Sequence, residues 1–299
     1  MNSKKLKSIF YTVSAVLFWS TSATAFKLTL QGINFAQLLF FSSLFSFIYL
    51  FVTVSLTARG QLFNFLDKKY LIKNLVLGFT NPFLYYLILF KAYSILPAQE
   101  VIALNYTWPI AIAVFSALFL SHKLTTRILL GMLIAFSGVV IVAVRGDIFA
   151  LKFQNITGVL LATGSSVVWA SFWTLNLKDD RIVQVKLLGA FLVGTILSAA
   201  YLFFFESFKI QDPVYLLGTV YIGLFEMGLT FLLWLKGLEL SPNKAKTSTL
   251  AYIAPFISLI LVVIILGEKL LFSSVVGLLI IVSGIIIQNY KLGRKFGKV

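Results

Sequence analysis

Residues 121–144 read SHKLTTRILLGMLIAFSGVVIVAV, and residues 267–290 read GEKLLFSSVVGLLIIVSGIIIQNY. At a constant offset of 146 residues, eight of these 24 positions are identical. Shared hydrophobicity alone does not reproduce spaced identities such as Ser137-Gly138 and Ser283-Gly284. A self-similarity of this kind indicates that the chain contains two copies of one structural unit.

The similarity continues toward the N-terminal part of each copy at an offset of 145 residues. The paired positions are Gly78 with Gly223, Asn81 with Glu226, Leu84 with Leu229, Lys91 with Lys236, and Pro97 with Pro242. Trp19 and Trp169 take corresponding places in the first apolar segment of each copy. We therefore expect two repeats, residues 1–150 and residues 151–299, with five apolar segments in each.

The composition places the repeats in a membrane. Of the 299 residues, 60 % are hydrophobic and 12 % are charged, and the mean hydropathy is +0.97. A soluble domain is roughly 45 to 50 % apolar and about 25 % charged. The excess apolar surface must face lipid, which excludes a peripheral or single-pass protein.

About 20 apolar residues cross a bilayer core of about 30 Å as a helix, so the chain has room for about ten helices. The expected spans are Ile9–Phe26, Phe35–Leu56, Leu71–Phe90, Ala98–Leu120, Ile128–Val144, Ile156–Leu177, Leu187–Phe205, Val214–Leu235, Ala245–Leu266 and Leu271–Gln288. The expected fold is an all-α polytopic membrane protein with ten transmembrane helices. Because each repeat has an odd number of spans, the two repeats insert with opposite orientation. Inverted repeats are typical of transporters that bind their solute near the membrane midplane.

The basic residues predict the orientation of these helices. With the N-terminus inside, the inner segments hold 19 of the 25 Lys and Arg residues. The outer segments hold the other six, Lys27, Lys91, Arg145, Lys152, Lys209 and Lys269. This bias predicts a multi-pass protein of the cell inner or plasma membrane with both termini cytoplasmic. It also accounts for the net charge of +15 through orientation and contact with anionic lipid, without nucleic acid as a partner.

Two stretches resemble a known family. Residues 96–100, LPAQE, precede residues 105–109, NYTWP, and in the second repeat Gly267-Glu268-Lys269-Leu270 is followed by Gly277 and Ser283-Gly284. The sequence resembles the EamA-type branch of the drug/metabolite transporter superfamily, although Ser121-His122 replaces the Gly-Glu turn in the first repeat. The resemblance implies a central cavity lined mainly by the first, third, fourth, sixth, eighth and ninth helices, and export of amino acids or related metabolites.

Polar residues mark one face of two predicted spans. The eighth span carries Thr219, Gly223, Glu226 and Thr230, and the third carries Asn74, Gly78, Asn81 and Tyr85 at the same spacing. This spacing keeps one face of a helix. Glu226 lies near the middle of its span, where an acidic side chain costs about 3 kcal/mol. We expect it to bind the solute and to couple transport to protons, or alternatively to hold helices together by a hydrogen bond.

Trp19, Trp108 and Trp169 lie near the middle of their predicted spans, whereas Trp234 fits the aromatic belt at the membrane interface. Aromatic faces near one carboxylate favour an ammonium-bearing solute through cation–π contacts, with packing as the alternative. Tyr85, Tyr86, Asn105 and Tyr106 would supply oriented hydrogen bonds. The predicted substrate-binding residues are Trp19, Asn81, Tyr85, Asn105, Tyr106, Trp108, Trp169, Trp173, Glu226 and Thr230, with Glu226 also as the proton-coupling residue.

Other residues refine this picture. Pro82, Pro109 and Pro255 are expected to interrupt their helices, either as hinges or as packing features. Glu100, just after Pro97, is expected in a first helical turn, where the helix dipole favours it.

An enzyme is not expected from this sequence. It has no cysteine and one histidine, His122, and it lacks a phosphate-binding loop. We expect neither a cofactor nor a metal. The predicted partners are a small-molecule substrate and the lipid bilayer, with a homodimer left open. The favoured function is a secondary transporter, with a channel-like facilitator and a non-transporting or lipid-handling subunit as alternatives.

Overall fold

A computed structural model describes residues 3–119, 125–147, 155–176, 179–210, 212–242, 247 and 249–289. The predicted turn at Ser121–Leu124 lies outside the described residues, and so does His122. The same holds for Lys152 and for the basic residues that follow Tyr290.

All regular structure in the described ranges is helical, which confirms the predicted all-α class. The α-helices are α1 Ser3–Thr29, α2 Phe35–Thr57, α3 Lys68–Gly78, α4 Tyr85–Ile95, α5 Ala98–Asn105, α6 Trp108–Phe119, α7 Thr126–Ala143, α8 Ile156–Asn176, α9 Val183–Phe205, α10 Leu216–Tyr221, α11 Thr230–Leu240, α13 Ala254–Leu266 and α14 Phe272–Asn289. Tight 3-10 turns form η1 Arg59–Gln61, η2 Asn64–Leu66, η4 Pro213–Tyr215 and η6 Thr249–Ile253, and wider π-helical turns form η3 Phe79–Leu84 and η5 Ile222–Leu229.

Eight helical stretches in the described residues are long and apolar enough to cross a membrane. They are Ser3–Thr29, Phe35–Thr57, Lys68–Ile95, Thr126–Ala143, Ile156–Asn176, Val183–Phe205, Pro213–Leu240 and Thr249–Leu266. The predicted span Ala98–Leu120 is divided into α5 and α6, and Phe272–Ile287 is a shorter apolar helix. The chain is therefore a multi-pass membrane protein.

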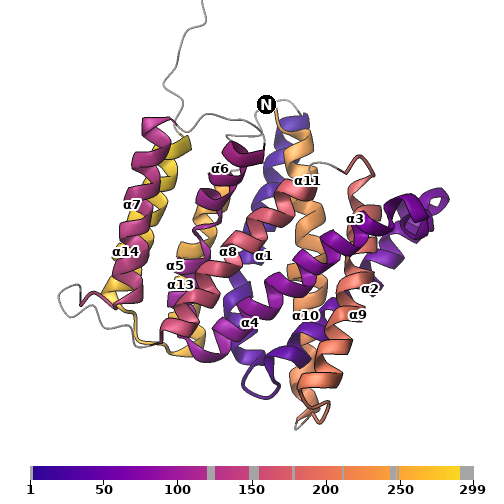
Figure 1. Cartoon of the computed structure of the whole chain (residues 1–299), viewed down its shortest axis with the longest axis horizontal. Helices are drawn as coiled ribbons and strands as arrows, with labels where there is room; N and C mark the ends of the chain where they lie inside the picture. The colour runs from indigo at the N-terminus through magenta and orange to yellow at the C-terminus, as the bar shows by residue number, and fades with distance from the viewer. Residues whose placement is uncertain are drawn as a thin grey trace, which may run out of the picture.

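The helix pair formed by the repeated stretch stands at one end of the molecule. α7 and α14 lie side by side there, while α2 and α9 pack together at the opposite end (Figure 1). Glycines allow the close approach of α7 and α14: a Cβ on Gly138 would lie 2.6 Å from the carbonyl oxygen of Gly277, and one on Gly284 would lie 2.4 Å from that of Gly131. Small residues commonly bring membrane helices together in this way.

The predicted helix breaks are present in three forms. Asn81 has extended backbone angles (φ −152°, ψ 122°) between α3 and α4, directly before Pro82. α5 ends at Asn105, and Pro109 stands in the first turn of α6. At Pro255 the preceding turns are 3-10, and α13 begins at Ala254. These breaks give the interior of the molecule non-regular backbone where the predicted site residues gather.

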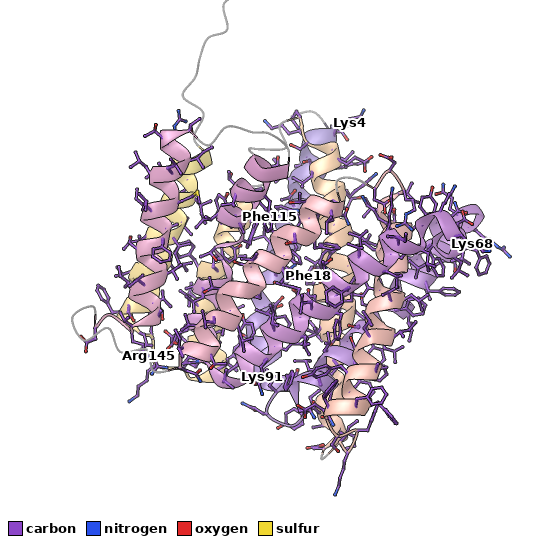
Figure 2. All side chains as sticks on the ribbon, in the orientation of Figure 1. Lys4, Phe18, Lys68, Lys91, Phe115 and Arg145 are labelled. Atoms are coloured by element: carbon purple, nitrogen blue, oxygen red, sulfur yellow. The ribbon has the colours of Figure 1, made fainter. Side chains whose placement is uncertain are left out.

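Basic residues mark two opposite edges of the molecule. Lys4 lies at the upper edge, and Lys91 and Arg145 lie at the lower edge (Figure 2). This separation agrees with the predicted assignment of Lys4 to one side of the membrane and of the other two to the opposite side. Which edge faces the cytoplasm stays a prediction.

Candidate functional site

Glu226 has side-chain partners from two other helices. It lies in η5 and is 7 % exposed. The hydroxyl of Ser22 in α1 donates to its Oε2, and the hydroxyl of Tyr86 in α4 donates to its Oε1 at 3.1 Å. The carboxyl group thus links a residue of the second predicted repeat to two residues of the first. Its predicted neighbours Thr219, Gly223 and Thr230 are also buried.

Asn81 occupies the corresponding position in the first predicted repeat. Its side chain is fully buried in η3, and among the described residues neither its Oδ1 nor its Nδ2 has a hydrogen-bond partner. Leaving a buried donor or acceptor unpaired costs about 1 to 3 kcal/mol. Buried polar groups are nearly always paired, so an unpaired amide indicates a place suited to a polar ligand or a water molecule.

A second polar group surrounds the end of α5. Asn105 donates from Nδ2 to the hydroxyl of Ser165 in α8 at 2.7 Å, and the hydroxyl of Tyr85 points to its Oδ1 at 3.5 Å. Tyr106 donates to the backbone carbonyl of Ala251. These contacts fix the non-helical junction between α5 and α6, and they connect it to α4, α8 and η6.

An aromatic wall joins the two polar groups. We use this name for Tyr85, Trp169, Trp173 and Phe231. The Trp169 ring centroid lies 4.7 Å from that of Tyr85, 5.5 Å from that of Phe231 and 5.7 Å from that of Trp173. Trp173 stacks on Phe231 at 6.1 Å with an interplanar angle of 12°. Tyr85 in turn contacts Tyr86, the partner of Glu226, with a distance of 4.7 Å between their ring centroids.

Trp19 reaches this wall from α1. The centroid of its ring lies 6.4 Å from that of Phe231 and 5.1 Å from that of Trp234. The prediction that Trp234 belongs to an interfacial belt is wrong, because its side chain is 6 % exposed and packs in a buried cluster beside Trp19. Facing indoles from α1 and α11 bury more apolar surface than an interfacial position would.

Trp108 and Thr230 are less closely connected to Glu226. Trp108 makes a ring contact with Tyr106 at 6.5 Å, and within the described residues no ring contact or hydrogen bond joins it to Tyr85 or Asn105. The hydroxyl of Thr230 already donates to the backbone carbonyl of Phe225. Their predicted contact with a solute stays a prediction.

Sequence reasoning missed Ser22, Ser165 and Phe231. Ser22 ends a polar run with Ser20 and Thr21 in the first span, and this run was an available signal. Phe231 carried no signal of its own, because phenylalanine is frequent among the lipid-facing residues of this chain. Only the packing of α11 against α1 and α8 shows its place.

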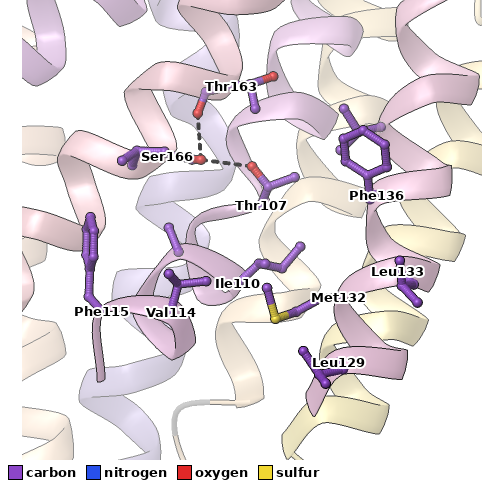
Figure 3. A pocket seen from close by; sticks show the side chains of 13 residues that line it. Thr107, Ile110, Val114, Phe115, Leu129, Met132, Leu133, Phe136, Thr163 and Ser166 are labelled. Carbon is purple, nitrogen blue, oxygen red and sulfur yellow. Dashed lines mark hydrogen bonds between the residues drawn. The ribbon is translucent and has the colours of Figure 1, made fainter. Parts of the chain in front are cut away.

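A cavity of about 610 Å³ lies between α6, α7 and α8 (Figure 3). Its lining is mainly apolar and includes Ile110, Leu133 and Phe136, while Thr107 and Ser166 share a hydrogen bond of 2.8 Å at its wall. Leu133 and Phe136 are 66 % and 64 % exposed, so the cavity borders the lipid-facing surface. None of the ten predicted site residues lines it.

Within the described ranges, His, Cys, Asp and Glu residues form no group of three or more that would hold a metal ion.

Comparison with known proteins places this sequence in a family. The profile of the EamA-like transporter family matches residues 6–144 and again residues 156–290. The chain belongs to this family. It is thus a member of the drug/metabolite transporter type, as the motifs in both repeats indicated. The match in each half covers the helices that carry Glu226, Asn81 and the aromatic wall.

Several relatives of this family member have names that refer to transport. The uncharacterized transporter YvbV of Bacillus subtilis is 29 % identical over 222 residues, 73 % of this chain and 71 % of YvbV. The aromatic amino acid exporter YddG of Ancylobacter novellus is 26 % identical over 188 residues, 62 % of this chain and 65 % of YddG. These names point to transport across a membrane rather than to catalysis.

One solved crystal structure has a similar fold. It matches with a TM-score of 0.67 and 24 % identity, and the match covers 94 % of this chain and 95 % of that one. At this identity the match supports the fold alone.

Proposed function

We propose that this family member is a secondary transporter that exports small organic metabolites carrying an ammonium group, such as amino acids. Two inverted five-helix repeats, residues 1–150 and 151–299, would alternate access to a site at their interface. The two matches to the family profile, one in each half, support this division. The relative named as an aromatic amino acid exporter supports the direction and the substrate class. Both termini face the cytoplasm in this proposal.

The observation that carries the proposal is the pair of donors on Glu226. Ser22 and Tyr86 supply neutral hydroxyls, and within the described residues no Lys or Arg forms an ion pair with Glu226. A buried carboxylate that has no cationic partner in the protein is neutralised by binding a proton or a cationic solute. One residue can therefore exchange the proton for the solute.

Two further features suit the rest of such a solute. The aromatic wall lies beside Tyr86 and would pack on an apolar side chain or on the ammonium group. At the corresponding position of the first repeat, Asn81 has a buried donor and acceptor without a partner among the described residues, and in this proposal they bind the polar end of the solute. Because Asn81 is neutral where Glu226 is acidic, the pair provides one titrating group and at most one proton for each cycle.

Coupling needs only that protonation and solute binding favour different access states. A ligand shifts a conformational equilibrium solely by its differential affinity for the two states. The proton and the solute compete for the same carboxyl oxygens, which already face donors from α1 and α4. Movement of one repeat against the other would break or form these contacts.

The test is transport into proteoliposomes by Glu226→Gln. This change keeps the size and the hydrogen-bonding capacity of the side chain but removes its titration. We expect pH-driven accumulation of the solute to be lost while exchange of internal for external solute persists. Glu239→Gln is the matched control, because Glu239 is exposed and pairs with Lys236 at the surface, and it should transport normally.

The same assay separates the alternatives. Undiminished, pH-dependent accumulation by Glu226→Gln would leave Glu226 as a structural link between helices. Uptake that equilibrates but never accumulates would favour a channel-like facilitator. Absence of uptake for a broad panel of amino acids and metabolites would favour a non-transporting or lipid-handling subunit.

A further inference from the structure

The loop after α13 holds the first turn of α5 at the lower edge of the molecule. The backbone N–H of Ala98 donates to Oε1 of Glu268 at 2.9 Å. Gln99 donates from Nε2 to the carbonyl of Lys269 at 2.9 Å, and its Oε1 accepts from the backbone N–H of Leu271 at 2.8 Å. We call these five residues the clasp. It joins residues about 170 positions apart, one group from each predicted repeat.

Two further contacts hold the helices beside the clasp. Lys27 of α1 donates to the carbonyls of Tyr93 and Leu96 at 2.9 and 3.0 Å, which satisfies the end of α4. Arg145, at the end of α7, forms an ion pair with Glu100 at 2.6 Å. Glu100 therefore has a partner besides the helix dipole that the sequence indicated. Arg145 lies at the lower edge in Figure 2, together with Lys91.

The chemistry of the clasp differs from that of the permanent helix contacts. Its hydrogen bonds are made by polar groups that water would satisfy after separation, so opening it exchanges protein partners for water at a small net cost. The glycine contacts between α7 and α14 offer no such replacement. The clasp can form and open while the paired helices stay packed.

The clasp also fixes the position of a predicted site residue. α5 is a helix of eight residues that begins with the clasp residues Ala98 and Gln99 and ends with Asn105. Asn105 contacts Tyr85 and Ser165 deeper in the molecule. A displacement of the first turn of so short a helix moves its last residue as well.

We propose that the clasp is the gate of the candidate transport site at the edge marked by Lys91 and Arg145, and that Gln99 and Glu268 are positioning residues for that gate. The inference rests on the proposed transport function and adds its conformational step. Alternating access requires contacts between the repeats that exist in one state and are broken in the other. The clasp closes this edge, and its separation admits or releases the solute there.

Accessibility of an engineered thiol tests the gate without measuring transport. The chain has no cysteine, so Asn105→Cys or, as a second reporter, Ser165→Cys gives a single reactive site. A membrane-impermeant thiol reagent is applied from the face that labels Ser94→Cys, an exposed residue at the end of α4 near the clasp. The labelling rate then reports how often this edge is open.

Variants of the clasp residues should raise this rate only where they remove its hydrogen bonds. Gln99→Leu and Glu268→Leu remove hydrogen bonds and should raise the labelling rate by at least roughly two- to twelvefold, the range expected for one such bond. Glu268→Gln keeps an acceptor for the N–H of Ala98 and should keep the original rate. Glu239→Leu, at an exposed ion pair away from the clasp, is the control and should change nothing.

An unchanged rate in both Gln99→Leu and Glu268→Leu, with folding confirmed by gel filtration, overturns the gate. A rise that Glu268→Gln shares equally also overturns it, because a lost charge rather than a lost hydrogen bond would then be responsible. If labelling responds as expected but no solute is transported, the gate stands and the proposed function fails. If Glu268→Leu does not fold, the comparison of Gln99→Leu with Gln99→Glu gives the same decision, since a glutamate accepts from Leu271 but cannot donate to Lys269.

Discussion

The hydroxyl of Tyr86 lies 3.1 Å from Oε1 of Glu226, across the boundary between the two predicted repeats. Tyr86 is fully buried, and its ring also contacts Tyr85 at 4.7 Å. A change in the protonation or the partners of the Glu226 carboxyl group therefore acts on Tyr86, which contacts Tyr85 of the aromatic wall. A solute that displaces this hydroxyl would change the packing of α4 against η5 and α8.

Tyr86→Phe tests this contact by removing a single hydroxyl. We expect the free energy of unfolding to fall by about 1 kcal/mol and transport to weaken, because Glu226 keeps only Ser22 as a donor. Tyr93→Phe, on the same helix, removes a hydroxyl that does not touch Glu226 and should leave transport unchanged. Thermal unfolding in detergent and proteoliposome uptake are the measurements. Equal behaviour of the two variants would contradict the proposed role of Tyr86.

Local sequence patterns predict the burial of several candidate site residues and the helix break beside one of them. The spacing of polar residues anticipated the buried faces that carry Asn81 and Glu226, and Pro82 anticipated the break beside Asn81. These features depend on residues within one or two turns of a helix. The repeat offset added the correspondence between Asn81 and Glu226, because it compares positions rather than contacts.

The same patterns do not predict contacts between residues that are distant in the sequence. The partnership of Gln99 with Leu271 joins two loops, and no periodicity encodes it. The sequence alone relates Glu100 to the helix dipole, because it gives no sign that Arg145, 45 positions away, lies nearby. Trp234 fits an interfacial belt by its position at the end of a span, because the sequence does not show whether a second indole or lipid packs against it. Tertiary packing decides these three cases.

Trp169 is the centre of the aromatic wall, so its removal should weaken solute binding. We expect Trp169→Ala to reduce the affinity about two- to thirtyfold, the range for loss of one cation–π contact, and Trp169→Phe to retain most of it. Quenching of intrinsic tryptophan fluorescence by the solute measures the affinity. Phe204→Ala is the control, since this side chain is 74 % exposed toward lipid. Unchanged affinity of Trp169→Ala would assign the wall to packing alone.

Two glycine substitutions are expected to have opposite effects on stability, one at Gly284 in the contact between α7 and α14 and one at Gly164 in α8. In Gly284→Ala the new Cβ would lie 2.4 Å from the carbonyl of Gly131, and this overlap should destabilise the protein by about 1 to 3 kcal/mol. In Gly164→Ala no atom of the described residues lies within 4 Å of the new Cβ, so the higher helix propensity of alanine should stabilise the protein by up to about 1 kcal/mol. Thermal unfolding of the two variants in the same detergent measures the difference. Equal melting temperatures would show that α7 and α14 do not pack this closely.

The connection between α8 and α9 predicts a pH dependence of stability. Burial alone would raise the pKa of Asp179, but hydrogen bonds from the side chain and backbone of Arg181 outweigh burial and hold that pKa below the ordinary value of 3.8. A depressed pKa in the folded state contributes stability above pH 3.8 that is lost as the pH falls through the folded value.

Asp179→Asn should therefore melt at a lower temperature than the original chain at neutral pH. As the pH is lowered through 4 and below, the two melting curves should converge. Asp67→Asn is the control, because the side chain of Asp67 is half exposed and forms a long ion pair of 3.9 Å with Lys69 at the surface. This variant should melt at the same temperature as the original chain. A constant difference between Asp179→Asn and the original chain down to the lowest pH measured would refute the proposed origin of the dependence.

The number of membrane crossings can be decided by reporter fusions, because each helix that fails to cross reverses every later site. α5 and α6 are each too short to cross alone, and α14 is the shorter apolar helix. If α5 and α6 cross together and α14 also crosses, fusions after Gly60, Arg181 and the C-terminus should report the cytoplasm. Fusions near Gly32 and Gly146 should then report the outside.

If the α5–α6 pair does not cross, Gly146, Arg181 and the C-terminus all reverse while Gly32 and Gly60 keep their sides. If only α14 does not cross, the C-terminus alone reverses. The 19 to 6 division of Lys and Arg favours the first pattern, and either of the others would remove the odd number of spans on which the inverted repeat depends.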